Sequence, residues 1–555
     1  WVRTDEWYNF RTDPTDSVEV LLALDETTYE GGTMGERHPI AWLRTYDGGR
    51  SFYTALGHTK ESFVDPLFAR HVLKGIEWAA GALAPFVEPD FPFITTTVDA
   101  TGLAPFMPEG NVAVRGIALQ LGHGAYASFD PDLLRMSAGW TGGFVSMTTM
   151  AQVSYDEPNN KSNEIPRVLG RPVFGTGLYP GWAGGEPTFG DPRPPGPNPD
   201  DPGRGPLDAE LGRWNGLYVV GDEVVLSYSV QGVEVLEAPG SARAGNAVGI
   251  TRTFEVGATS NPLALVAAEV RGAGAAQVDS NTAVVPHGAA SDSVTAVGVV
   301  GRPEGAVLRV EAGRYVTLRL AEGTTASRFR LVLWTGPRAQ LPRFREMLRG
   351  PVEMPDVESP SERWTHAVQT RGRVAPDTSA FVIDELSLPR PNPWRRNVRV
   401  ADVDFFEDGR AAVVTFEGDV WLVSGIDDGL ERLHWERFAS GLYEPLSLSI
   451  VEGDVYVYGR EGIVRLHDRN GDGEADFYEN FSNLAIQSTE TREWPLDMVP
   501  RPEGGFFLSM GGALNAGPRS AASREAVPGF RAGSRHAGTV MQVSADGDSI
   551  RVVAD

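Results

Sequence analysis

A short segment near residue 470 concentrates side chains that bind hard cations. Asp468, Asn470, Asp472, Gly473 and Glu479 match the calcium-loop pattern D-x-[DN]-x-[DN]-G-x5-E position by position. Alternate residues of a tight loop point inward together, and a glycine permits the backbone reversal that the loop needs. Converging carboxylates repel each other unless a cation lies among them. The pattern therefore predicts a structural Ca²⁺ site, with a solvated acidic turn as the alternative.

The residues around this acidic loop indicate strands and not the two helices of an EF-hand. Val464-Arg465-Leu466 precedes the loop and Phe477-Tyr478 follows it. Glu474 and Asp476 add two carboxylates to the predicted ligand set. Because the flanks are extended, Glu479 is the ligand that we expect to fall outside the coordination sphere.

Four polar residues near the N-terminus lie where strands are expected to end. These residues are Asp25, Glu26, His38 and His58. Open α/β sheets place ligand sites at strand ends, and a histidine beside a carboxylate can do acid–base work or bind a metal. The sequence thus offers them as substrate-binding candidates. The alternative is structural, with His38, which precedes a proline, capping a turn.

Composition limits the function classes. The chain has 555 residues, a formal net charge of −25 and no cysteine. The acidity argues against nucleic acid as a partner, and the lack of cysteine excludes disulfides, thiolate metal sites and cysteine nucleophiles. No apolar run is long enough to span a membrane, and no P-loop, G-x-S-x-G or H-E-x-x-H motif occurs.

Residues 1–85 are predicted to be the last part of an α/β domain. We expect buried strand 18–24, strands 40–44 and 50–54, and a helix over 65–80 whose buried face carries Phe68, Val72 and Ile76. The segments DEWYNF, HPIAW, GGRSFYTALGHT and GIEWAAG resemble the C-terminal part of a ThuA-like (trehalose-utilisation) domain. The resemblance implies a glutamine-amidotransferase-like α/β fold, and we expect the natural protein to begin upstream.

Residues 90–345 are predicted to form a β-sandwich-like domain. Strands are expected at 216–220, 223–228 and 329–334, with a long Pro/Gly loop over 191–206. The segments FDPDLLRMSAGWTGGF and GPLDAELGRWNGLYVVGDEVVLSYSV resemble an uncharacterised domain of large secreted proteins from environmental bacteria. Aromatic side chains near its turns could stack on sugar rings, although most such residues belong to cores; the candidates are Trp140, Trp182, Trp214, Tyr218 and Tyr228.

A Pro-rich connector over 346–396 leads to residues 397–555, which are predicted to form three to four blades of an incomplete β-propeller. Strand, tight turn and strand repeat at short intervals, as at 410–416 and 419–423 and again at 454–458 and 462–466. The whole chain is thus expected to be multidomain and mainly β, with a partial α/β segment, a sandwich-like middle and this partial propeller.

The sequence of residues 397–555 resembles glucose/sorbosone-dehydrogenase-like quinoprotein propellers. The matching segments are DFFEDGRAAVVTFEGDVWLV, GREGIVRLHDRNGDGEADFYENF and SRHAGTVMQVSADG. The resemblance implies a histidine base acting on a sugar hydroxyl and arginines that hold pyrroloquinoline quinone, which here would be His536 and Arg535. It also implies further blades and an electron-accepting cytochrome domain as redox partner. An ordinary loop histidine is the alternative.

Three hypotheses follow. The first is an extracytoplasmic (periplasmic or secreted) protein of carbohydrate metabolism, acting on a sugar or sugar derivative as a quinoprotein-like dehydrogenase. The second is a calcium-stabilised scaffold that binds carbohydrate or a surface without catalysis. The third is a glycan hydrolase or lyase with its active site in the middle domain. Propellers host enzymes and scaffolds alike, so fold alone does not decide among them.

Overall fold

The structure is a computed structural model, and it describes residues 3–35, 38–46, 49–79, 91–146, 166–196, 203–289, 291–360, 363–364, 367–394, 396–489, 493–514, 531–532 and 534–554. The chain divides into two compact units, Trp1–Asp90 and Phe91–Asp555. The predicted boundary at residues 85–90 lies outside the described residues. No described helix is long and apolar enough to cross a membrane.

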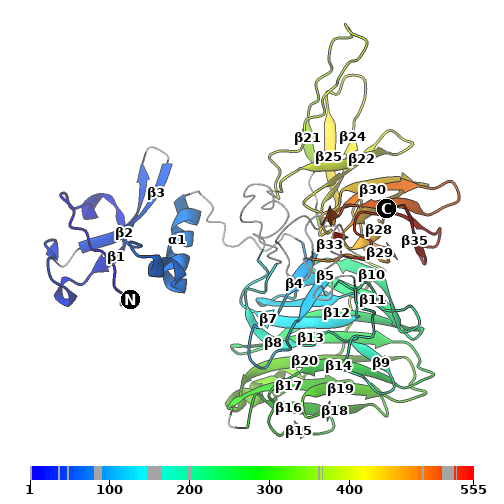
Figure 1. The fold of residues 1–555 in the computed structure, drawn as a ribbon, viewed down its shortest axis with the longest axis horizontal. Coiled ribbons are helices and arrows are strands. Elements are labelled where there is room, and N and C mark those ends of the chain that lie inside the picture. The colour runs from blue at the N-terminus through cyan, green and yellow to red at the C-terminus, as the bar shows by residue number, and fades with distance from the viewer. Residues whose placement is uncertain are drawn as a thin grey trace. The chain divides into compact units, whose positions relative to one another are not determined.

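The first unit is a three-stranded antiparallel sheet with one α-helix (Figure 1). Its elements are β1 (Glu19–Leu24), β2 (His38–Tyr46), β3 (Gly49–Thr54) and α1 (Pro66–Ala79). These confirm the three predicted strands and the predicted helix. Phe68 is buried in a small core with Ile40. The prediction that these elements are buried was wrong for two residues. Leu21 of the outer strand β1 and Ile76 of α1 are exposed in this unit.

The second unit is built from antiparallel sheets. One sheet has five strands, β4 (Phe93–Asp99), β5 (Val112–Gln120), β6 (Ala125–Asp130), β7 (Arg135–Thr141) and β8 (Arg171–Gly175). Another has four, in the order β18 (Val307–Glu311), β19 (Tyr315–Leu320), β14 (Leu263–Glu269) and β9 (Trp182–Gly184). The short helix α2 (Leu341–Met347) packs near β12 (Val233–Ala244) and β13 (Ala247–Val256).

The largest sheet has twelve strands and runs through two of the predicted regions. In order these are β15 (Gln277–Val278), β16 (Thr282–Pro286), β17 (Ser293–Val300), β20 (Ser327–Pro337), β13 (Ala247–Val256), β12 (Val233–Ala244), β11 (Glu223–Val230), β10 (Gly212–Val220), β29 (Phe477–Ser482), β28 (Gly462–His467), β27 (Asp454–Gly459) and β26 (Ser447–Val451). The regions join where β10 pairs with β29, with Leu217 opposite Tyr478. One hydrophobic core, which includes Trp140, Phe254 and Val457, extends across the join.

The described part of residues 397–554 contains three antiparallel meanders, one after the other along the chain (Figure 1). Each meander has four strands. The first is β22 (Val400–Phe405), β23 (Ala411–Thr415), β24 (Val420–Ser424) and β25 (Leu433–Ala439), extended by β21 (Val368–Thr370). The second is β26 to β29. The third is β30 (Pro495–Pro500), β31 (Phe506–Met510), β34 (Val540–Val543) and β35 (Ile550–Ala554), with the small pair β32 (Ala513–Leu514) and β33 (Arg531–Ala532) beside it.

The meanders meet through their first strands. The Asp402 carboxylate of β22 accepts hydrogen bonds from Ser447 Oγ and Leu448 N of β26, both at 3.0 Å. The Met498 N–H of β30 donates to Ser447 Oγ at 3.1 Å. Apolar side chains of the second and third meanders share a core that includes Tyr458. The fold is mainly β with several sheets, and the described residues form no closed barrel or propeller.

Candidate functional site

The acidic loop lies between β28 and β29, so strands flank it as predicted. The Asp468 carboxylate accepts backbone N–H groups from Gly471 at 2.7 Å, Asp472 at 3.2 Å and Gly473 at 3.0 Å. Gly473 has φ +92°, the left-handed conformation that favours glycine. Asn470 Nδ2 donates to Asp472 Oδ2 at 2.8 Å. The loop is therefore tightly turned around the first carboxylate.

A third carboxylate joins this turn. Asp476 Oδ2 accepts the Arg469 N–H at 3.0 Å. Burial raises the pKa of Asp476, and the negative charges of Asp472 and Asp468 raise it further. In the described part of the chain no three acidic or histidine side chains converge closely enough to hold a metal ion. The oxygen donors of the loop are nevertheless of the type that Ca²⁺ prefers.

The two glutamates of the predicted ligand set have other partners. Glu474 is buried and accepts the backbone N–H groups of Arg363, at 3.1 Å, and Trp364, and it pairs with the Arg363 guanidinium at 3.3 Å. Glu479 lies in β29 and contacts His467 Nε2 at 2.6 Å. An ion in the loop would therefore be held by Asp468, Asn470, Asp472 and Asp476. The assignments of Glu474 and Glu479 as ligands stay predictions, with both side chains engaged by other partners in this arrangement.

The same loop fastens the connector to the second meander. The Arg469 guanidinium donates to Val357 O at 3.2 Å and to the Glu358 carboxylate at 2.9 Å. Asn470 Nδ2 donates to Pro360 O at 3.3 Å. The acidic loop thus holds Val357, Glu358 and Pro360 against the turn between β28 and β29.

His536 lies just before β34 with 8% of its surface exposed, whereas Arg535 is exposed. Its Nδ1 accepts the Ile486 N–H at 2.9 Å. Burial lowers the pKa of His536 to about 4, and the positive charges of Arg535 and Arg115 act in the same direction. The ring is therefore neutral at pH 7, and because the Nδ1 lone pair is occupied, its proton sits on Nε2. In this state His536 is a hydrogen-bond donor and not a base.

Buried side chains hold the segment that His536 contacts. Ser534 Oγ donates to Ile486 O at 2.8 Å, and Arg460 Nη2 donates to Ser488 O at 3.2 Å. The Glu493 carboxylate accepts the Ser488 N–H at 2.8 Å. Burial raises the pKa of Glu493 to about 7. Sequence reasoning missed Glu493, because an isolated glutamate outside any repeat carries no local signal.

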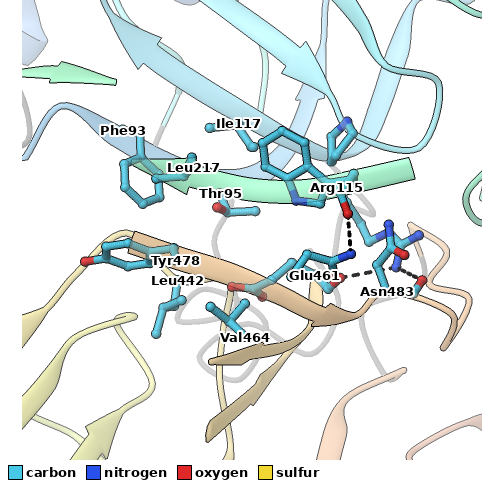
Figure 2. A pocket seen from close by; sticks show the side chains of 13 residues that line it. Phe93, Thr95, Arg115, Ile117, Leu217, Leu442, Glu461, Val464, Tyr478 and Asn483 are labelled. Carbon is cyan, nitrogen blue, oxygen red and sulfur yellow. Dashed lines mark hydrogen bonds between the residues drawn. The ribbon is translucent and has the colours of Figure 1, made fainter. Parts of the chain in front are cut away.

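A second carboxylate, that of the half-buried Glu461, lines a small cavity between the five-stranded sheet and the second meander (Figure 2). The cavity encloses about 40 Å³, which is room for a few water molecules and not for a sugar. Arg115 lies beside it and donates to Asp132 Oδ2 at 3.2 Å and to the backbone carbonyls of Asn483 at 2.6 Å and Ala485 at 3.3 Å. Arg115 was also missed, because nothing in the sequence near β5 distinguishes it.

Glu461 gives stability a pH dependence. Burial raises its pKa to about 7, opposed by the Tyr443 N–H and Arg115 and assisted by Glu444. The folded state therefore binds more protons than the unfolded state between pH 4 and 7, and this term weakens folding by up to roughly 3 kcal/mol as the pH rises through that window. We expect Glu461→Gln to stabilise the protein by roughly 2 kcal/mol at pH 8 and by little at pH 5, measured by urea unfolding.

The exposed Glu503 supplies the control for this pH prediction, because its side chain is 73% exposed and pairs with Arg501 at 3.4 Å. Glu503→Gln should change the free energy of unfolding equally little at both pH values. A Glu461→Gln effect that is the same at pH 5 and pH 8 would contradict the assignment of a raised pKa.

The N-terminal candidates do not form one site. Glu26 and His38 are together, with His38 Nδ1 2.7 Å from Glu26 Oε1 and His38 Nε2 2.9 Å from Tyr8 O. Asp25 instead accepts the Thr27 N–H at 3.0 Å at the start of a 3₁₀ turn. His58 is exposed and pairs with Glu6 at 2.7 Å. The pair of half-buried Glu26 and buried His38 joins local segments of the first unit.

The aromatic candidates separate by burial. Trp140, Trp182 and Tyr228 are core residues, whereas Trp214 and Tyr218 are half-buried. Only the last two are accessible enough to contact a ligand.

Comparison with known families assigns two segments of the chain. Residues 1–79 match the family described as trehalose utilisation, ThuA. The first unit carries a ThuA domain. Residues 127–237 match a domain of unknown function, DUF6797, which covers the strands from β6 to β11 and part of β12. A search of curated proteins gave no match. The ThuA match is therefore followed in the sequence by a β unit for which the second match gives no activity.

Proposed function

We propose that this chain acts in extracytoplasmic carbohydrate metabolism and that residues 397–555 belong to a quinoprotein-like sugar dehydrogenase propeller. The observation that carries the proposal is the row of three four-stranded meanders joined through β22, β26 and β30, which is how blades of a propeller pack. The ThuA match, described as trehalose utilisation, supports the link to sugars.

Arg535 and His536 are the residues that would contact the cofactor. An exposed guanidinium and a neutral imidazole with its proton on Nε2 are both donors, and the carboxylates and carbonyls of pyrroloquinoline quinone are acceptors. The quinone would supply the two-electron acceptor for sugar oxidation. In this geometry His536 would donate its Nε2–H to an oxygen of the quinone and would not remove a proton.

The tautomer of His536 can be measured directly. We expect ¹⁵N NMR of the histidine side chains to show the Nε2–H form for His536, unchanged from pH 8 to about pH 5, because burial holds its pKa at about 4. The exposed His58, which lies beside Glu6, supplies the comparison spectrum of a solvent-accessible histidine. An Nδ1–H form, or titration of His536 near pH 6.5, would contradict this geometry. His536 would then again be the candidate for the base.

The enzymatic proposal is tested by redox-dye reduction with a panel of aldoses and trehalose, after the protein is supplied with Ca²⁺ and pyrroloquinoline quinone. Activity that is lost in His536→Ala and retained in His536→Gln, whose amide can still donate, supports a donor role. Activity lost equally in both variants supports a base. No dye reduction by the full protein, with the quinone bound, would refute the dehydrogenase.

The non-catalytic scaffold is the second candidate, and two observations favour it. The cavity beside Arg115 holds only water-sized molecules, and the Nδ1 of His536 is already occupied. A scaffold would bind glycans on an array without converting them. Glycan binding combined with no dye reduction would select this candidate.

We also propose Ca²⁺ as a structural ion in the acidic loop. Its support is the placement of oxygen donors from Asp468, Asp472 and Asp476 in one tight turn, where the charges of the first two raise the pKa of the third, together with the attachment of Val357 and Pro360 to the same loop. The ion would neutralise the carboxylates and keep the connector docked.

A further inference from the structure

An open groove lies where the start of β10, the end of β29 and the turn before β35 meet. It encloses about 140 Å³. Its polar lining comes from Arg213, Trp214, Asn480, Ser482, Asn483 and Asp548. The space holds roughly ten water-sized spheres, which suits a single sugar ring of about a dozen non-hydrogen atoms. Part of the groove belongs to the domain of unknown function and part to the second and third meanders.

Trp214 gives the groove a fixed aromatic wall. The indole is half-buried and packs against Phe129, with ring centroids 5.4 Å apart. Its backbone carbonyl accepts the Asn480 side-chain amide at 2.8 Å. Aromatic rings with one apolar face accessible pack against the C–H face of a sugar ring. The wall is held in place before any ligand arrives.

Two polar atoms of the groove residues lack partners. Ser482 Oγ and Asn483 Nδ2 are buried, with side chains 3% and 9% exposed, and neither has a hydrogen-bond partner among the described residues. Buried polar atoms are nearly always hydrogen-bonded, so such a pair calls for a ligand or water. A hydroxyl group both donates and accepts, and it can satisfy either atom.

The opposite charges of Arg213 and Asp548 cancel at the mouth of the groove. Arg213 Nη1 lies 2.6 Å from Asp548 Oδ1, and both side chains are about half exposed. A paired guanidinium and carboxylate add donors and acceptors without net charge. This favours a neutral polyhydroxyl ligand over a phosphate or a sugar acid.

We propose that this groove is a binding site for one neutral sugar ring. Trp214 supplies the apolar wall, Ser482 and Asn483 supply the buried hydrogen-bonding atoms, and Arg213 with Asp548 closes the mouth. The assignment rests on the carbohydrate link of the proposed function, and it does not depend on the quinone or on redox chemistry.

The test is calorimetric titration of the full chain with methyl α-D-glucopyranoside, methyl β-D-galactopyranoside and trehalose. We expect Ser482→Ala to weaken binding about fivefold while leaving the melting temperature equal or higher, because its hydroxyl has no partner to lose among the described residues. Asp548→Asn should also weaken binding.

Ser128 provides the matched control. Its Oγ is also buried without a partner among the described residues, but it lies in β6 and outside the groove lining. Ser128→Ala should leave sugar affinity unchanged. No heat with any of the three sugars, which means a groove that holds water only, would overturn the proposal, as would equal affinity in Ser482→Ala and the parent protein. Sugar binding without dye reduction would retain the groove and reject the dehydrogenase.

Discussion

Replacing Arg115 by methionine should lower the free energy of unfolding of the β unit by about 3–5 kcal/mol. Arg115 is 1% exposed, and its guanidinium holds Asp132 and the carbonyl oxygens of Glu461, Asn483 and Ala485. The substitution leaves a buried carboxylate without its counter-charge and three carbonyls without a donor. Removing one partner of a buried pair carries the full desolvation penalty of the other.

The measurement is urea unfolding of Arg115→Met beside a surface control. Arg167 pairs with Asp99 at 3.7 Å with 69% of its side chain exposed, so Arg167→Met should cost about 0.5 kcal/mol or less. Equal losses in the two variants would show that Arg115 does not join the five-stranded sheet to the meanders. The double variant Arg115→Met with Asp132→Leu should recover part of the loss, because the orphaned carboxylate is then absent.

Chelation of Ca²⁺ should lower the melting temperature of the protein. An ion present at a hundred times its dissociation constant stabilises the folded state by about 2.7 kcal/mol, and this term disappears in EGTA. Because the loop also anchors Val357 and Pro360 through Arg469 and Asn470, we expect the connector to gain protease sensitivity when the ion is removed. Differential scanning calorimetry with Ca²⁺ and with EGTA measures the first effect, and limited proteolysis the second.

Two variants distinguish a residue that binds the ion from a residue that only lies near it. Asp468→Ala should abolish the response to EGTA, since this carboxylate organises the loop. Glu479→Gln should retain the response, because Glu479 is engaged with His467. A melting curve that EGTA leaves unchanged would refute the calcium site. A response lost in Glu479→Gln would return that residue to the ligand set.

Local patterns predicted the strands well. The alternation around Gly462–His467 and the turn glycines beside it predicted β27 and β28 to within a residue, because both the side-chain period and the turn chemistry are local properties. The acidic loop was likewise visible as spaced oxygen donors. The strands on either side of the loop were also predicted correctly, because the pattern that indicates them is local.

The pairing of distant segments could not be predicted. Glu474 was placed in the metal site because its neighbours are acidic, yet its partner Trp364 lies 110 positions away in the chain. The role of His536 depends on the amide of Ile486, 50 positions away. A single sequence carries no signal for such contacts, so residue types were identified and their hydrogen-bond partners were not.

The pairing of β10 with β29 has a consequence for how this protein can be handled. Asn480 and Trp214, which are hydrogen-bonded beside this pairing, are 266 positions apart, so the sheet closes late and at a high entropic cost. Expressing residues 90–345 and 397–555 separately would leave each with an unpaired row of amides and carbonyls, a ready template for aggregation. Fragments for study should therefore keep both strands in one polypeptide, and refolding should be carried out at low protein concentration.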